Sequence, residues 1–73
     1  MEYENLLKRI ALNIKIERVK RQLTQEKLAE LVDVHEKHIG KIEAGKQNIT
    51  FKTLFRIATA LNVDITKLLA KID

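Results

Sequence analysis

Two histidines three residues apart, His35 and His38, are side chains whose type and spacing suggest metal chemistry, because imidazole nitrogens bind metal ions. Glu36 lies between them and adds a carboxylate. Zinc sites take three or four protein ligands, yet the chain has no cysteine and offers no convincing third ligand. We therefore expect no metal ion and no cofactor.

Two threonines, Thr24 and Thr50, are candidate nucleophiles. A hydroxyl attacks only when a base lies beside it and an oxyanion hole stabilises the product, and neither is visible in the sequence. A chain of 73 residues also has too small a core for a deep substrate cavity. We expect neither an enzyme nor a small-molecule ligand.

The charge balance favours a polyanionic partner. Fourteen basic residues against ten acidic ones give a net charge of +4, which suggests attraction to nucleic acid, although a solvated basic face would explain the same number. A composition of 45% hydrophobic and 33% charged residues supports one folded domain over residues 1–73.

No apolar run approaches the roughly 18 residues of a membrane span, and Glu2 and Glu4 make the N-terminus unlike a signal peptide. We expect a cytoplasmic protein with no membrane partner.

The positions of the apolar residues predict an all-α fold, because they recur three and four residues apart and the chain has no proline. Helices are expected over about residues 3–21, 25–32, 36–44 and 51–61, and from residue 64 onward. Thr24 and Thr50 are expected to cap helix starts, and Asp33, Gly45 and Asn62 to end helices.

Each of the first four helices carries an apolar face that should meet the core, and the last carries an apolar stripe that is generous for a terminal segment with little left to cover. These faces comprise Tyr3, Leu6, Leu7, Ile10, Ile14 and the stem of Arg18; Leu28, Ala29 and Val32; Ile39 and Ile42; Phe51, Leu54, Phe55, Ala58 and Leu61; and Ile65, Leu68, Leu69 and Ile72. A second stripe, Leu12, Ile16 and Val19, lies opposite the first face and needs either the last helix or another chain to cover it. Gly40 weakens its helix, so a close neighbour needs the space or packing holds the helix.

Residues 25–44 form two short helices joined by a tight turn. Small Ala29 stands where the helices approach, and Ile39 and Ile42 hold the second helix against the first. Such a rigid corner can push its second helix into the major groove of DNA while the first lies across the phosphates.

Three segments and one residue recur at a spacing typical of a known family: Leu-Thr-Gln-Glu-Lys-Leu-Ala at 23–29, Ile39, Ile-Glu-Ala-Gly-Lys at 42–46 and Leu-Phe-Arg-Ile-Ala-Thr-Ala-Leu at 54–61. The chain resembles the lambda Cro/cI repressor family, also called the XRE family, over about residues 10–69. The resemblance implies a compact five-helix, lambda-repressor-like DNA-binding domain. The loop Asn48, Ile49, Thr50 also resembles the controller proteins of restriction-modification systems. The chain departs from the family pattern at three positions. Asp33 stands where the family usually has a turn glycine, and Glu17 stands where it prefers a small or apolar residue. Ile49 stands where many members have proline.

The resemblance implies roles for individual residues. Gln25 would bind a phosphate at the start of its helix. Side chains on or near the recognition helix, about residues 36–44, would meet base edges and flanking phosphates: His35, Glu36, Lys37, His38 and Lys41. The following loop and helix start would grip the backbone through Lys46, Gln47, Asn48 and Lys52. Because lysine can donate to guanine and glutamate can accept from cytosine, a half-site containing G·C is expected, and Glu36 would also repel wrong sites.

The family often pairs an arginine and a glutamate behind the motif, which implies an ion pair between Arg18 and Glu43 that orients the recognition helix. The alternative leaves Arg18 on solvent or phosphate, with Glu17 competing for it.

One recognition helix reads few base pairs, so we expect a homodimer whose two helices lie ~34 Å apart on a pseudo-palindromic operator. Segment 64–72 has more apolar residues than it needs, and the expected dimer patch is formed by Ile65, Leu69 and Ile72, extended by Phe55. Core packing is the alternative role of these residues. The function predicted is that of a transcriptional regulator on double-stranded DNA. The rival is an antitoxin or adaptor that binds another protein through Leu12, Ile16 and Val19, with DNA binding secondary.

Overall fold

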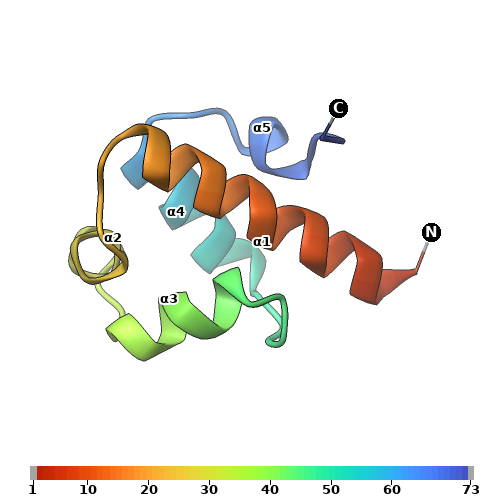
Figure 1. Ribbon diagram of the computed structural model, residues 1–73, viewed down its shortest axis with the longest axis horizontal. Helices are drawn as coiled ribbons and strands as arrows, with labels where there is room; N and C mark the ends of the chain where they lie inside the picture. The colour runs from red at the N-terminus through yellow and green to blue at the C-terminus, as the bar shows by residue number, and fades with distance from the viewer. Residues whose placement is uncertain (1, 73) are drawn as a thin grey trace.

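The computed structural model describes residues 2–72 as a bundle of helices (Figure 1). The helices are α1 (Tyr3–Lys20), α2 (Gln25–Val32), α3 (Glu36–Glu43), α4 (Phe51–Leu61) and α5 (Ile65–Leu69). Residues 2–72 contain no strand, so the predicted all-α, five-helix class is confirmed.

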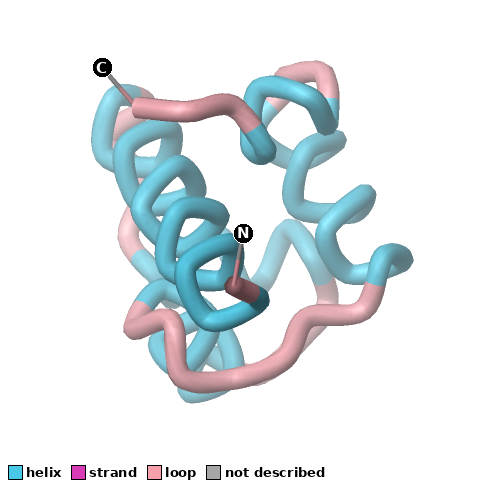
Figure 2. The backbone as a smooth tube through the Cα atoms, turned by 90° about the vertical axis from the view of Figure 1, so that its right-hand side faces the viewer, coloured by secondary structure: helices cyan, strands magenta, loops and turns pink. Residues whose placement is uncertain are grey.

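The helices surround a core with α1 and α4 on opposite sides of the molecule (Figures 1 and 2). In the view of Figure 1, α1 crosses the front, α4 lies behind it, α5 lies above and α3 below. Helix α2 packs against α3 and α4, and α1 packs against α3 and α5. This arrangement leaves one long side of α3 at the surface of the molecule.

Helix boundaries follow the capping residues closely. Thr24 Oγ1 accepts the Lys27 amide at 3.0 Å, and Thr50 Oγ1 accepts the Thr53 amide at 3.1 Å, as expected for N-caps. The predicted helix ends adopt the left-handed conformation, with φ values of 63° at Asp33, 57° at Asn62 and 71° at Gly45. Helices α1 and α3 end one residue before the predicted positions, at Lys20 and Glu43.

The core draws side chains from all five helices. Its fully or nearly fully buried members are Ile10, Ile14, Leu28, Ala29, Val32, Ile39, Ile42, Leu54, Ile57, Ala58, Leu61 and Leu68. Ala29, Ile39 and Ile42 are among them, so the corner of α2 and α3 is held as the sequence predicted.

Two of the predicted core faces were partly wrong. On α4 the buried face is formed by Leu54, Ile57, Ala58 and Leu61, so Phe51 and Phe55 are exposed instead of buried. Phe55 follows Leu54 by about 100° around the helix, which turns its ring away from the core. Tyr3 is also exposed, because the first turn of α1 extends past the other helices (Figure 1).

The short C-terminal helix packs on one flank of α1. Asn13 Nδ2 donates to the carbonyl oxygens of Leu68 at 2.9 Å and Ala70 at 2.8 Å, which satisfies groups at the end of α5. Ile72 lies beyond the end of α5, so the predicted helical stripe stops at Leu69. Among residues 2–72, none of the helices combines the length and apolar composition that crossing a bilayer requires.

The second stripe of α1 is not covered by α5. Leu12 is 46% exposed and Val19 is 56% exposed, whereas Ile16 is half-buried. Of the two ways to cover the stripe, the last helix is therefore excluded within residues 2–72.

Candidate nucleic-acid interface

The turn between α2 and α3 is built by backbone hydrogen bonds. The Asp33 amide donates to the Glu30 carbonyl at 3.3 Å, and the Val34 amide donates to the Ala29 carbonyl at 3.0 Å. This pair of bonds is the Schellman arrangement, which reverses the chain directly after a left-handed residue. Asp33 therefore performs the turn that a glycine usually makes, at the cost of a left-handed conformation in a residue with a side chain.

Helix α3 divides into a buried side and a polar side. Ile39 and Ile42 are buried against the rest of the corner. The side chains predicted to contact bases, Glu36, Lys37 and Lys41, are exposed on the other side. Lys46, Asn48 and Lys52, which follow on the loop and the start of α4, are exposed as well. The fold thus brings these polar residues to the surface together with α3.

Both histidines take part in local hydrogen bonds. His35 Nδ1 accepts the Lys37 amide at 3.1 Å and so serves as the N-cap of α3. His38 Nδ1 lies 3.1 Å from Gln47 Nε2, which connects α3 with the loop that follows it. Sequence reasoning missed both contacts, because histidine is not a typical capping residue and residues nine positions apart share no helical period.

An ion pair behind the corner connects α1 with the end of α3. Arg18 Nε donates to Glu43 Oε2 at 2.7 Å and Arg18 Nη2 donates to Glu43 Oε1 at 3.1 Å, so the expected pair is present in bidentate form. The side chains are 12% and 3% exposed. Arg18 Nη1 also donates to the Leu23 carbonyl at 2.6 Å, which holds the turn before α2.

Gln25, predicted to bind a phosphate, belongs to the same network. Its Nε2 donates to Glu43 Oε1 at 3.1 Å. A primary amide carries two N–H groups, so one remains for another acceptor. The bond to Glu43 was not foreseen, because it depends on how α2 and α3 meet rather than on sequence spacing.

Beside this network lies an open recess of about 220 Å³ lined by Lys15, Gln25, Gly40, Glu43 and Ala44. A Cβ added at Gly40 would meet Gln25 Oε1 at 3.6 Å, which is an ordinary van der Waals contact. No close neighbour therefore requires glycine here, and packing of Ile39 and Ile42 holds α3 in place. Lys15 adds a positive side chain that sequence reasoning did not assign to the site.

Glu17 does not compete for Arg18. Its Oε1 accepts from Arg21 Nη1 at 2.8 Å, and its Oε2 lies 3.6 Å from Lys20 Nζ. The hydrogen bond from Arg21 holds the pKa of this buried carboxylate below its ordinary value, although burial acts in the opposite direction. A charged residue is thereby accommodated where the family prefers a small or apolar one.

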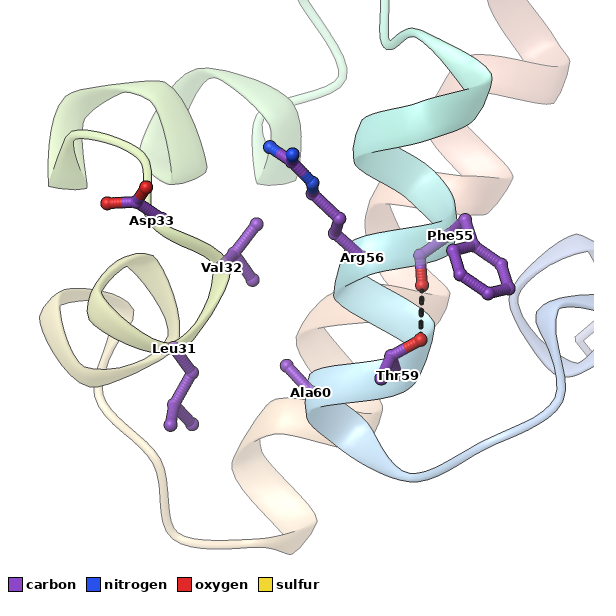
Figure 3. Close-up of a pocket in the computed structure, with 7 residues that line it drawn as sticks. All are labelled: Leu31, Val32, Asp33, Phe55, Arg56, Thr59 and Ala60. Atoms are coloured by element: carbon purple, nitrogen blue, oxygen red, sulfur yellow. Dashed lines mark hydrogen bonds between the residues drawn. The ribbon is translucent and has the colours of Figure 1, made fainter.

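A groove of about 440 Å³ lies between α2 and α4 (Figure 3). Leu31 and Ala60 line it, while the ring of Phe55 points away from both of them. The Phe55 carbonyl accepts from Thr59 Oγ1 at 3.0 Å within α4. Phe55 is 57% exposed, so its ring forms part of the outer face of α4.

Comparison with known proteins identifies this architecture. The sequence profile described as "Helix-turn-helix" matches residues 14–68. The control protein C.SmaI of Serratia marcescens is 39% identical over 62 residues, which span 85% of this chain and 74% of that protein. The chain belongs to the XRE-type helix-turn-helix family. The resemblance inferred from segments 23–29, 42–46 and 54–61 is therefore confirmed.

Solved structures of helix-turn-helix proteins superpose closely on this one. The restriction-modification controller protein C.AhdI from Aeromonas hydrophila matches with a TM-score of 0.82 and 27% identity, over 85% of this chain and 94% of that chain. The wild-type controller C.Esp1396I matches with a TM-score of 0.81 and 29% identity, over 93% and 87% of the two chains. As an XRE-type helix-turn-helix protein, the chain is a DNA-binding regulator of transcription and not an enzyme.

Proposed function

We propose that the chain is a sequence-specific regulator that binds a pseudo-palindromic operator as a homodimer, with α3 as its recognition helix in the major groove. One observation carries the proposal. The corner buries Ile39 and Ile42 and leaves Glu36, Lys37 and Lys41 exposed on the opposite side of α3. A helix held in this way can enter a groove without giving up its own packing.

In this proposal, phosphate contacts set the register of the protein on DNA. Gln25 donates one amide hydrogen to Glu43, which orients the second hydrogen for a phosphate at the start of α2. Arg18 neutralises Glu43, so the carboxylate does not repel the phosphate. Lys46, Gln47, Asn48 and Lys52 supply further donors along the backbone.

In the same proposal, side chains of the first turns of α3 contact the bases. Lys37 donates to guanine O6 or N7, and Glu36 accepts from cytosine N4, which favours G·C in each half-site. Lys41, one turn later, extends the contact along the groove, and His35 and His38 reach its edges. Glu36 also weakens binding to sites that place a phosphate near it, and this repulsion adds specificity.

The homodimer is proposed to form through the outer faces of α4 and α5. Phe55 and Ile72 are exposed, and Ile65 and Leu69 are half-buried with part of their surfaces against the core. Both alternative roles of this segment thus have support, because the same side chains pack inward and still present an apolar surface. A two-fold pairing there would present two copies of α3 to one side of the DNA.

The likeness to C.SmaI, C.AhdI and C.Esp1396I suggests what the operator controls. The printed names of these relatives describe control proteins, two of them controllers of restriction-modification systems. We infer that this chain acts in the cytoplasm on genes of such a system.

The test is selection of binding sites from random duplexes, followed by salt titrations of the selected DNA. A pseudo-palindrome is expected. Lys37→Ala should relax the preference at one position of each half-site, by roughly 1–3 kcal/mol. Lys46→Ala should weaken binding to all sequences and reduce the salt slope by about one unit per protomer.

Lys20→Ala is the matched control, because it removes the same charge from an exposed position of α1 that borders Glu17 instead of α3. Lys20→Ala should leave the base preference unchanged and should alter the salt slope only slightly. Failure to enrich any sequence, together with weak binding at low salt, would disprove the proposal and favour the antitoxin or adaptor alternative.

A further inference from the structure

The outer face of α1 carries an apolar stripe that neither the fold nor the proposed function uses. Leu12, Ile16 and Val19 repeat once per turn and line an open groove of about 370 Å³ together with Lys15 and Lys20. Leu12 and Val19 are about half exposed, and α5 packs on a neighbouring flank of α1. The branched side chain of Val19 has a lower helix propensity than lysine or glutamate, so at an exposed position it does not favour the helix.

The charges around this stripe have one sign. Lys8 and Lys15, seven residues apart, run along one border, and Lys20 stands at the other. From residue 5 to residue 25 the only acidic residue is Glu17, which is buried and paired with Arg21 and Lys20. The outer face of α1 therefore combines the apolar stripe with basic edges, and residues 5–25 present no exposed carboxylate.

We propose that the outer face of α1 is a docking surface for an acidic amphipathic helix of another protein. The apolar stripe of Leu12, Ile16 and Val19 would pack against the apolar face of the partner helix, and the flanking lysines would form ion pairs with its aspartates or glutamates. A second copy of this chain fits poorly, because a two-fold pairing through this face would bring lysines against lysines. Duplex DNA also fits poorly, because a phosphate backbone offers no apolar surface to the apolar stripe.

The location of the face allows it to act alongside the proposed function. Helix α1 lies on the opposite side of the molecule from α4, so a dimer through α4 and α5 leaves the outer face of α1 free (Figures 1 and 2). Leu12, Ile16 and Val19 do not line the recess beside Gln25 and Glu43, although Lys15 lines both that recess and the groove on α1. The partner helix would bind while the operator is occupied.

The direct test uses two synthetic helical peptides with the same leucine stripe, one edged with glutamates and the other with lysines. Fluorescence anisotropy of each labelled peptide is measured with the full chain, free and bound to DNA. The acidic peptide should bind in both states and the basic peptide should not. The double variant Leu12→Gln, Val19→Gln should weaken binding roughly tenfold, and Lys15→Glu should weaken it as well.

Leu31→Gln is the matched control, because Leu31 is 51% exposed on α2 and lies outside this face. It should leave peptide binding unchanged, and every variant should keep the circular dichroism spectrum of the wild type. Absence of acidic-peptide binding, equal binding of both peptides, or equal losses in the double variant and the control would overturn the proposal.

Two further measurements separate other occupants. If the wild type binds phosphatidylglycerol vesicles and the double variant does not, the face binds a membrane surface and the proposal is overturned. A sedimentation experiment in which the double variant dissociates the dimer would assign the face to a second copy. The expected result is no vesicle binding and an unchanged oligomeric state. The DNA affinity of the double variant should also be unchanged, so failure here leaves the operator proposal intact.

Discussion

At the residue scale, the Glu43 carboxylate accepts hydrogen bonds from two side chains of the protein at once. Arg18 contacts both of its oxygens, and Gln25 shares Oε1. Because Arg18 also binds the Leu23 carbonyl, one guanidinium connects α1, the turn before α2 and the end of α3. Loss of the Glu43 charge would leave a mostly buried guanidinium without its counter-ion, which is the costly way to break such a pair.

We therefore predict that Glu43→Gln lowers the free energy of unfolding by roughly 2 kcal/mol, measured by urea denaturation. Glu30→Gln is the control, because Glu30 and Lys27 form an exposed pair at 3.5 Å with side chains 69% and 52% exposed. The control should change stability by less than about 0.5 kcal/mol. Equal effects of the two substitutions would show that the network behind the corner is no stronger than a surface pair.

Glu17 makes stability depend on pH. Since its pKa is depressed in the folded protein, chiefly by the hydrogen bond from Arg21, its contribution is present above the ordinary value of 4.5 and is lost as the pH falls through the folded pKa. Glu17→Gln should be less stable than wild type near neutral pH, and the difference should shrink on acidification. Urea denaturation at several pH values checks this. A difference that stays constant or widens in acid would contradict it.

At the element scale, the sequence predicted where helices begin and end better than which way they face. Thr24, Thr50, Asp33 and Asn62 carry local signals, because a capping hydroxyl or a left-handed residue acts within a few positions. The orientation of α4 has no such signal. Seven residues of α4 are apolar and fit more than one face, and contact with α2, α5 and α1 places Ile57 inside and Phe55 outside.

The same distinction holds for the site. The Arg18–Glu43 pair was predicted because the family spacing implies it, and the exposed polar side of α3 follows from the burial of Ile39 and Ile42. The contacts of Gln25 with Glu43 and of His38 with Gln47 were not predictable, because each joins two elements whose approach is set by the packed core.

The two glycines should respond in opposite ways to alanine. Gly40→Ala is expected to stabilise the protein by about 0.5–1 kcal/mol, because α3 has ordinary helical backbone there and room for a Cβ. Gly45→Ala should destabilise it by roughly 1 kcal/mol, because Gly45 has φ of +71° and a Cβ would lie 3.3 Å from Lys8 Cγ. Thermal unfolding of both variants checks the pair, and a loss of stability in Gly40→Ala would indicate a hidden steric role.

At the scale of the whole molecule, three faces point in different directions. The polar side of α3 is proposed for DNA, the outer faces of α4 and α5 for a second copy, and the outer face of α1 for a partner protein. The net charge of +4 favours the first of these, because it attracts the chain to DNA. Apart from Lys15, which lines both the groove on α1 and the recess beside Gln25, the residues proposed for the three faces differ, so each face can be altered separately.

The dimer face is tested by Phe55→Glu. A glutamate at an exposed position should leave the monomer folded but place like charges near each other in a two-fold interface, so the dimer dissociation constant should rise roughly tenfold or more. Val19→Glu is matched in exposure at 56% and lies on α1 instead of α4. Analytical ultracentrifugation distinguishes them. If Val19→Glu dissociates the dimer and Phe55→Glu does not, the interface lies on α1.

The central claim is that α3 and the loop after it meet DNA. Titration of the isotopically labelled protein with its selected operator duplex, followed by amide chemical shifts in NMR spectra, tests this claim most directly. We predict the largest shift changes at Gln25, at residues 35–41 and at residues 46–52, with small changes at Leu12, Ile16 and Val19. Large changes along the outer face of α1, with residues 35–41 unaffected, would contradict the claim.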